Sequence, residues 1–310
     1  MSGLPLAEFE KYRSAMFGIA YRMLGSVSDA EDILQDAYLR WHDADRREVE
    51  SPRAFLSSIV TRLCLDRLRK VRRQREDYVG QWLPEPLLER SDTSVQPPEH
   101  IDRDVSTALM LALERLSPLE RAAFILHDVF DMSFEEVSAS IGRPEATCRQ
   151  LAKRARAHIA DARPRFTYAQ AEGERIAHAF FRAARDGDRA GLQTILAEDV
   201  RLHSDGGGKK LAALNVLAGA SRVSAFFIGI ASKSVLTRPI WTKAVTINDH
   251  PGQISVESDG TLQTLSVEVE GDRVTAIYFT RNPDKLSHLL SELPPEVAER
   301  VTPAREKDIG

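Results

Sequence analysis

The side chains best suited to acid–base chemistry lie in the second half of the chain. His203 and Asp205 stand two apart at the end of a strand-like run, and His250 follows. Residues two apart on a strand share a face, but general acid–base catalysis also needs an apolar cavity that presents them to a substrate. Because such a histidine is more often structural, we expect no catalytic residue and no enzyme. The alternative is turnover of a small carbonyl compound by the C-terminal segment.

A glycine-rich loop and two cysteines suggest other kinds of chemistry. The loop DGGGK, from Asp205 to Lys209, lacks the spacing and the following Ser or Thr of a phosphate-binding P-loop. Cys64 and Cys148 have no second Cys or His at metal-ligand spacing, and both stand at apolar positions of helical patterns. We therefore expect no cofactor and no metal, and we expect both thiols to pack in cores.

Basic side chains gather in two helical patterns, where they favour contacts to DNA. The first helix begins at Ser51-Pro52, and its second half is densely basic. The second follows SFEE, from Ser133 to Glu136, and a turn at Gly142-Arg143, which together are typical of a helix-turn-helix. Arginine and glutamine match the edges of guanine and adenine in the major groove. The DNA-binding residues predicted from these patterns are Arg62, Arg69, Lys70, Arg72, Arg73, Thr147, Arg149, Gln150, Lys153, Arg154 and Arg156.

A further helical pattern carries an acidic face. Ser28 and Glu31 predict a capping box, so a helix is expected to begin there. Its apolar stripe runs from Ala30 to Trp41, Tyr38 included, at helical spacing. The opposite face places a leucine among acidic and amide groups, and an apolar centre with a polar rim is typical of a docking patch. The residues of this face are Asp32, Gln35, Asp36 and Leu39.

The elements that position these groups divide the 310 residues into several domains. We expect all-α domains at 1–76 and 105–166, a linker at 77–104 and an α+β domain at 171–310. The net charge of −4 argues against indiscriminate coating of nucleic acid. No apolar run approaches the roughly 20 residues of a membrane span, and the N-terminus lacks the features of a signal peptide. We expect a cytoplasmic protein without membrane contact.

The linker contains an apolar patch that predicts docking. Trp82-Leu83-Pro84-Glu85-Pro86 lies among acidic and small polar residues, and an apolar patch in such a setting usually covers, or is covered by, something else. Beyond it, Ser117-Pro118 with Glu120 predicts another helix start. In the last part of the chain, alternating runs with a turn at Gly271-Asp272 predict antiparallel strands.

Taken in this order, the two helical segments resemble the extracytoplasmic-function group of the sigma-70 family. The resemblance covers about the first half of the chain. It implies a sigma factor that directs core RNA polymerase to promoters. The face around Asp32 would grip the polymerase clamp helices, the helix from Ser51 to Arg75 would read and melt the minus-10 element, and residues 147–156 would read minus-35. Asp66 fits base capture, whereas Arg62 stands where many relatives carry Asn. The matching residues are Asp29-Ala30-Glu31-Asp32, Gln35-Asp36, Leu65-Asp66, Leu68-Arg69, Leu116-Ser117-Pro118, Arg121, Phe134-Glu135-Glu136-Val137 and Arg154-Ala155-Arg156.

The rest of the chain resembles the subgroup that carries a fused SnoaL-like domain, a cone-shaped α+β barrel shared with ketosteroid isomerase. Three signatures of that subgroup are present: WLPEP, DGGGK and NPDKL. The resemblance implies that the C-terminal domain contacts the linker and sigma domains and tunes activity within the same chain. The residues that it assigns to this regulation are Trp82, Leu83, Pro84, Glu85, Pro86, Asp205, Gly206, Gly207, Gly208, Lys209, Asn282, Pro283, Asp284, Lys285 and Leu286.

A one-component repressor is the remaining alternative, with the helix-turn-helix on DNA and the C-terminal domain around a ligand. A repressor does not need the acidic face from Asp32 to Leu39. Binding to core polymerase therefore separates the two hypotheses.

Overall fold

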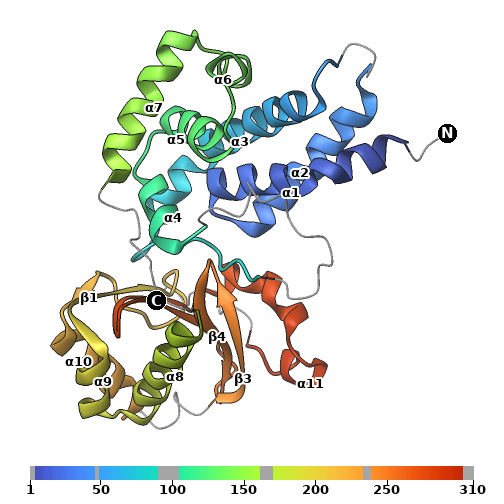
Figure 1. The fold of residues 1–310 in the computed structure, drawn as a ribbon. Coiled ribbons are helices and arrows are strands. Elements are labelled where there is room, and N and C mark those ends of the chain that lie inside the picture. Colours follow the sequence, from blue (N-terminus) through green and yellow to red (C-terminus); the bar gives the residue numbers. More distant parts are fainter. Residues whose placement is uncertain (1–3, 46–48, 90–104, 161–169, 233–238, 303–310) are drawn as a thin grey trace. The chain divides into compact units, whose positions relative to one another are not determined.

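The chain forms two units that are described separately below. The first, the helical unit, comprises residues 1–76 and 91–163, and the second, the α+β unit, comprises residues 77–90 and 164–310. None of the described helices is long and apolar enough to cross a membrane. The computed structural model describes residues 4–45, 49–89, 105–160, 170–232 and 239–302 (Figure 1).

The first helical segment contains three helices, and the second of them is capped by a different serine from the one predicted. Helix α2 is capped two residues earlier than expected, because the Ser26 side chain accepts from the backbone N–H of Asp29 at 3.0 Å. The predicted box of Ser28 and Glu31 is therefore wrong, and Glu31 instead pairs with Arg13 of α1 at 2.5 Å. The helices are α1 (Leu4–Leu24), α2 (Val27–Asp43) and α3 (Pro52–Glu76).

The second helical segment carries the predicted helix starts. Ser117 and Ser133 each form a complete capping box with the glutamate three residues on, which confirms both predictions. Gly142 adopts φ 64° after the first helix of the helix-turn-helix, a left-handed conformation that glycine takes without strain. The elements are α4 (Thr107–Glu114), α5 (Pro118–Phe124), the π-helix η2 (Ile125–Val129), α6 (Phe134–Ile141) and α7 (Glu145–Ile159).

The two helical segments share one unit, although the sequence pattern suggested separate domains. The buried Arg121 guanidinium donates to the carbonyl of Met23 at 2.7 Å and pairs with Glu114 at the same distance. Arg53 of α3 donates to the carbonyl of Phe130 at 2.6 Å. Cys64 and Cys148 are buried and free, as predicted. Arg121 and Arg53 thus each donate to a backbone carbonyl of the other helical segment.

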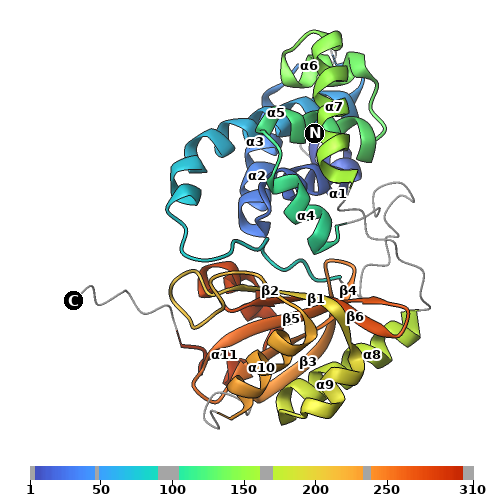
Figure 2. The ribbon, with the colours of Figure 1, turned by 90° about the vertical axis from the view of Figure 1, so that its left-hand side faces the viewer.

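The α+β unit is built on one sheet of six strands in the order β2-β1-β6-β5-β4-β3. β1 runs parallel to β6, and the other neighbours are antiparallel. Helices α8, α9 and α10 pack an apolar core against one face of the sheet (Figures 1 and 2). A second apolar cluster joins β4 and β5 to the C-terminal helical turns. The strands are β1 (Leu196–Asp205), β2 (Leu217–Ala218), β3 (Pro239–Ile247), β4 (His250–Glu257), β5 (Leu262–Glu270) and β6 (Arg273–Thr280). The helices are α8 (Gln170–Asp186), α9 (Arg189–Ile195), α10 (Ala220–Ala231), η4 (Pro283–Lys285), η5 (Ser287–Glu292) and α11 (Pro295–Ala298).

The predicted fold class, all-α segments followed by an α+β unit, is confirmed, with one correction. The sheet is open, because β2 and β3 are its edges and do not pair with each other. β2 contributes just two residues, Leu217 and Ala218, to the register with β1. The cone-shaped barrel expected from the resemblance is therefore a curved sheet with two ends.

Candidate functional site

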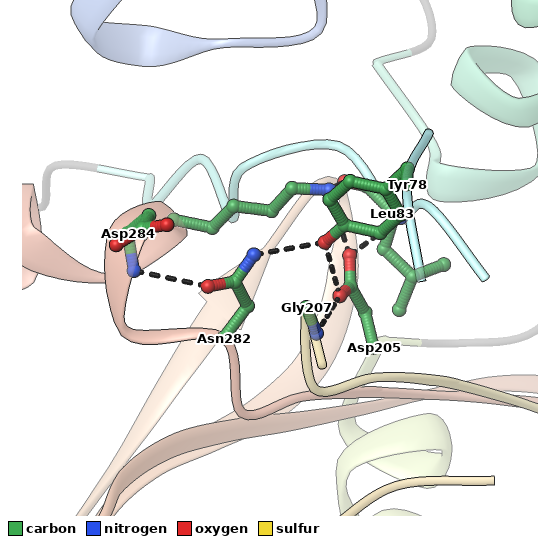
Figure 3. Close-up of polar contacts among 7 residues, drawn as sticks. Tyr78, Leu83, Asp205, Gly207, Asn282 and Asp284 are labelled. Atoms are coloured by element: carbon green, nitrogen blue, oxygen red, sulfur yellow. Dashed lines mark hydrogen bonds and ion pairs between the residues drawn. The ribbon is translucent and has the colours of Figure 1, made fainter. Parts of the chain in front are cut away.

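Three segments that are far apart in the sequence meet at one site in the α+β unit, which we call the linker site (Figure 3). It comprises Tyr78, Trp82, Leu83, Asp205, Asn282 and Lys285. The parallel register places Asp205, the last residue of β1, beside Thr280, the last residue of β6. Just beyond it, the backbone N–H groups of Arg281 and Asn282 donate to the Asp205 carbonyl at 2.7 and 3.1 Å. Strand pairing therefore delivers the DGGGK and NPDKL signatures to the same edge.

The carboxylate of Asp205 is the centre of the linker site. Its Oδ1 accepts from the Tyr78 hydroxyl at 2.5 Å and from the N–H of Gly207 at 3.0 Å. Its Oδ2 accepts from the N–H of Leu83 at 2.9 Å and from Nζ of Lys285 at 2.7 Å. A carboxylate offers about four acceptor positions, so these donors saturate a group that is fully buried.

Lys285 supplies the opposite charge within the same site. Its Nζ donates to Asp205 and to the carbonyl of Leu83. The same nitrogen lies 4.1 Å from the ring centre of Trp82 and 4.8 Å from that of Tyr78. Two oxygens and two aromatic faces thus replace water around a buried ammonium group, which stabilises the charge that burial would otherwise disfavour. The linker tryptophan is held through this cation.

Tyr78 is a residue of the linker site that sequence reasoning missed. Its hydroxyl donates to Asp205 and accepts from Nδ2 of Asn282 at 2.8 Å. Burial, together with the nearby Asp205 carboxylate, raises the pKa of the phenol well above its ordinary value, so the donating proton stays in place. The sequence offered only a weak signal, an aromatic residue between the basic helix and WLPEP.

The glycines of DGGGK allow close approach of the linker. Gly207 and Gly208 adopt φ values of 59° and 70°, where a side chain is strained. A Cβ on Gly207 would lie 2.4 Å from Nδ2 of Asn282, and one on Gly208 would lie 3.0 Å from Cβ of Val79. The Gly207 N–H is already bound by Asp205 and is therefore not available to a phosphate. The remaining charge, Lys209, pairs with Asp284 at 2.7 Å.

The rest of the linker follows the turn between β3 and β4. Nε2 of His288 contacts the carbonyl of Pro86 at 2.8 Å, and Glu85 is buried nearby. Leu87 exchanges hydrogen bonds with Asn248 at 2.9 and 3.1 Å. The N–H of Glu89 then donates to the carbonyl of Thr246 at 3.2 Å. The chain from Tyr78 to Glu89 is therefore held along its length.

The predicted acidic face lies exposed on α2. Asp32, Gln35 and Asp36 are exposed, and the central Leu39 has 55% of its surface accessible. The opposite stripe is buried except for Tyr38, which is half-buried against the ring of Phe9 at 5.3 Å. The helix therefore presents an apolar centre with a polar rim.

The recognition helix α7 presents its predicted DNA-binding residues to solvent. Arg149 pairs with Glu145 at 2.6 Å and lies 4.7 Å from the ring centre of Phe134. Arg156 pairs with Asp128 at 2.6 Å. Both pairs are partly exposed and available for exchange with phosphates. The exposed residues are Thr147, Arg149, Gln150, Lys153, Arg154 and Arg156.

In the basic helix α3, one residue predicted to contact DNA binds backbone carbonyls of the protein instead. The Arg62 guanidinium donates to the carbonyl of Ala139 at 2.8 Å and to that of Ser140 at 3.4 Å. These carbonyls end α6, where the helix dipole favours a cation. Asp66 and Arg69 pair at 3.0 Å and are exposed, as is Lys70. The side chains of Arg72 and Arg73 lie outside the described part of the chain.

The acid–base candidates His203, Asp205 and His250 do not line the cavity between α8, α10 and the sheet. Asp205 is saturated by its four donors, as described above. His250 is buried with Nε2 3.3 Å from Glu268, and the ring of His203 stacks 5.5 Å from that of Tyr278. The cavity between α8, α10 and the sheet is lined by other residues.

A helix-turn-helix with an exposed basic face, together with a second basic helix and an acidic-rimmed patch, defines a DNA-reading protein of transcription. The sigma-70 region 2 family matches residues 9–74, and the sigma-70 region 4 family matches residues 106–159. The ECF RNA polymerase sigma factor SigJ of Mycobacterium tuberculosis is 33% identical over an alignment of 294 residues, which covers 92% of this chain and 94% of that protein. A probable ECF RNA polymerase sigma factor SigI of the same organism is 29% identical, over 93% of this chain and 96% of its own.

The crystal structure of Mycobacterium tuberculosis SigJ has a TM-score of 0.72 to this structure at 31% identity, and the match covers 91% of this chain and 98% of SigJ. The protein therefore belongs to the ECF RNA polymerase sigma factors. It is an alternative sigma factor that binds core RNA polymerase and promoter DNA, and its C-terminal unit is SnoaL-like.

Proposed function

We propose that the α+β unit tunes promoter activity in the same chain by holding the linker between the two promoter-reading segments. The observation that carries this proposal is the linker site, where Asp205 and Lys285 together bind Tyr78, Trp82 and Leu83. Because a tethered segment has an effective concentration near the millimolar range, even a weak contact can hold the linker at this site.

Docking changes the length of chain that connects the two helical segments. α3 ends at Glu76, and α4 begins at Thr107. Held residues 78–89 take roughly 40% of the connecting chain, and each extended residue spans at most about 3.6 Å. The docked linker therefore limits how far the two segments can separate.

The contacts of Arg62 indicate whether a docked linker should raise or lower transcription. While Arg62 binds the C-terminal carbonyls of α6, this predicted DNA contact of α3 is occupied by the helix-turn-helix. Reading two promoter elements requires the segments to part, so a shortened connection favours the packed state. We expect release of the linker to raise transcription.

In vitro transcription with core polymerase tests this proposal directly. Trp82→Ala removes the aromatic face above Lys285 and is expected to raise output from a matched promoter several-fold, without unfolding either unit. Trp241→Ala, a tryptophan of β3 outside the linker site, is the matched control and is expected to leave output unchanged. Equal output from wild type and Trp82→Ala across a salt series would refute a regulatory role for docking.

Polymerase binding is proposed to use the α2 face of Asp32, Gln35, Asp36 and Leu39. The support is an exposed leucine within an acidic rim. The double reversal of Asp32 and Asp36 to Lys is expected to abolish binding to core polymerase while the helical content is kept. The same charge change at Glu296 and Glu299 of the α+β unit is the control. Normal binding by the α2 double variant would also reopen the repressor hypothesis.

The same proposal assigns minus-10 recognition to α3 and minus-35 recognition to α7. It places the protein in the cytoplasm, with the polymerase it serves, and gives the α+β unit no catalytic role. The support for that last assignment is the separation of His203, Asp205 and His250 from the cavity. Turnover of a carbonyl substrate by the full chain would contradict it.

A further inference from the structure

The α+β unit contains a cavity distinct from the linker site. It lies between α8, α10 and the concave side of β4, β5 and β6, and about 70 Å³ of it is open to the centres of water-sized molecules. That space corresponds to roughly five waters, each occupying about 10–15 Å³ on this measure. The apolar walls are formed by Phe181, Phe227, Ile230, Leu265 and Phe279. Such walls favour an organic occupant over water alone.

One end of the cavity carries a buried cation with an unused donor. Arg281 is 6% exposed and lines the cavity. One guanidinium nitrogen donates to the carbonyl of Leu211 at 2.7 Å, whereas Nε is buried without a hydrogen-bond partner among the described residues. A buried donor of a charged group is rarely left unpaired in folded proteins. An acceptor atom from a ligand would satisfy it.

The groups around Arg281 decide the sign of charge that the cavity accepts. Glu257 also lines it, and Oε1 of that side chain accepts from Ser255 at 3.0 Å and from Gln263 at 2.7 Å. Burial raises the pKa of Glu257, which favours the neutral acid. Arg185 lines the same cavity. The cavity lining thus includes two guanidinium groups and one carboxyl group whose pKa burial raises, while the carboxyl group of Asp259, outside the lining, also attracts Arg281.

We propose that this cavity binds a small apolar carboxylate, whose carboxylate group accepts from Nε of Arg281 and whose body lies among the aromatic walls. A cationic ligand would be repelled by the two arginines. A wholly apolar ligand would leave Nε unpaired. A carboxylate matches the planar donor geometry of a guanidinium group better than a single hydroxyl does.

Arg281 also connects the cavity to the linker site. We therefore expect ligand binding to be coupled to linker docking, an inference that rests on the proposed function. The backbone N–H of Arg281 donates to the carbonyl of Asp205, and its side chain holds Leu211. Two residues further on, the carbonyl of Ala213 accepts from the Gln81 side chain of the linker at 3.3 Å. A carboxylate that immobilises Arg281 therefore favours the docked linker. By linkage, docking strengthens ligand binding by the same factor.

Calorimetric titration of the full chain with benzoate and with benzyl alcohol tests the binding step. We expect benzoate to bind at least tenfold more tightly than the alcohol. Equal affinity for the two, or no binding of benzoate up to millimolar concentration, overturns the proposal.

Three variants place the binding in this cavity. Arg281→Gln is expected to weaken benzoate at least tenfold. Arg273→Gln changes an exposed arginine at the start of β6, outside the cavity lining, and is expected to leave the affinity unchanged. Ala184→Leu fills the cavity from α8 without removing a hydrogen bond, and it is expected to abolish binding even where Arg281→Gln fails to fold. Retained affinity in Ala184→Leu overturns the assignment.

A separate titration isolates the coupling. Trp82→Ala is expected to weaken the binding of benzoate several-fold, because it releases the linker and the ligand binds more tightly while the linker is docked. Unchanged affinity in this variant overturns the coupling but leaves the binding site in place. Unchanged transcription by Trp82→Ala, in contrast, would remove the proposed function without affecting the binding result.

Discussion

Helix α7 and the linker site both depend on basic side chains, but they place them in opposite environments. Lys153 and Arg154 are exposed on α7, whereas Lys285 is 7% exposed and bound by Asp205 and two aromatic rings. An exposed cation contributes binding free energy only when a phosphate of DNA binds to it, and salt screens that contribution. A buried cation has already exchanged water for fixed protein groups. The first arrangement suits reversible contact with DNA, and the second suits a fixed chain geometry.

The largest effect is expected from breaking the buried pair. Asp205→Asn leaves Lys285 as an uncompensated buried charge, and removal of one partner of such a pair costs about 3–5 kcal/mol. We expect the α+β unit to lose this stability in urea unfolding, and peptides from residues 78–89 to lose protection against hydrogen exchange. The double variant Asp205→Asn with Lys285→Met should recover part of the loss. A double variant no more stable than the single one would show that the charge itself is not the cause.

The exposed cations should affect DNA binding and leave stability unchanged. Replacing Lys153 and Arg154 with Ala removes two phosphate contacts if both reach the backbone, so the salt slope of binding should fall by about 1.8. Near 0.1 M salt this corresponds to a loss of roughly 60-fold in affinity. Fluorescence anisotropy with a promoter duplex across a salt series measures both quantities. Arg175→Ala on α8 is the control, and an unchanged slope in the α7 variant would contradict phosphate contact there.

A smaller effect is expected from removing a single hydroxyl of the linker site. Tyr78→Phe keeps the ring beside Lys285 but leaves Oδ1 of Asp205 and Nδ2 of Asn282 each without one partner. Loss of a buried hydrogen bond of this kind costs about 1–3 kcal/mol. Urea unfolding measures it, with Tyr12→Phe of α1 as the control. A Tyr78→Phe protein as stable as wild type would indicate that Trp82 alone anchors the linker.

The smallest effect concerns pH. Burial raises the pKa of Glu257 above its ordinary value of 4.5, so the folded protein binds this proton more tightly than the unfolded chain does. The stability that this proton contributes is complete below pH 4.5 and is lost as the pH rises through the folded pKa. Glu257→Gln should flatten the dependence of unfolding free energy on pH in that window. A slope identical to that of wild type would show that Glu257 titrates normally.

Local sequence signals were reliable where both interacting groups lie within one helical turn. Ser117 and Ser133 form the expected capping boxes, and α6 ends at the expected turn, where Gly142 adopts a left-handed conformation. The one capping error, Ser28 in place of Ser26, arose because two serines compete within three residues and Glu31 found a partner on α1. A distant partner can therefore override a local pattern even at a helix start.

The order of the elements, the exposed faces of α2 and α7, and the identity of the three signatures were all determined by the sequence itself, because each depends on spacing along one segment. The tertiary structure alone decided which residues those signatures contact. Tyr78 bonds to Asp205 and Asn282 across 127 and 204 residues of chain, and Arg62 reaches carbonyls 77 and 78 residues away. Such contacts follow from strand register and helix packing, which no local pattern encodes. The same holds for Nε of Arg281, which folding buried beside a cavity without a hydrogen-bond partner among the described residues.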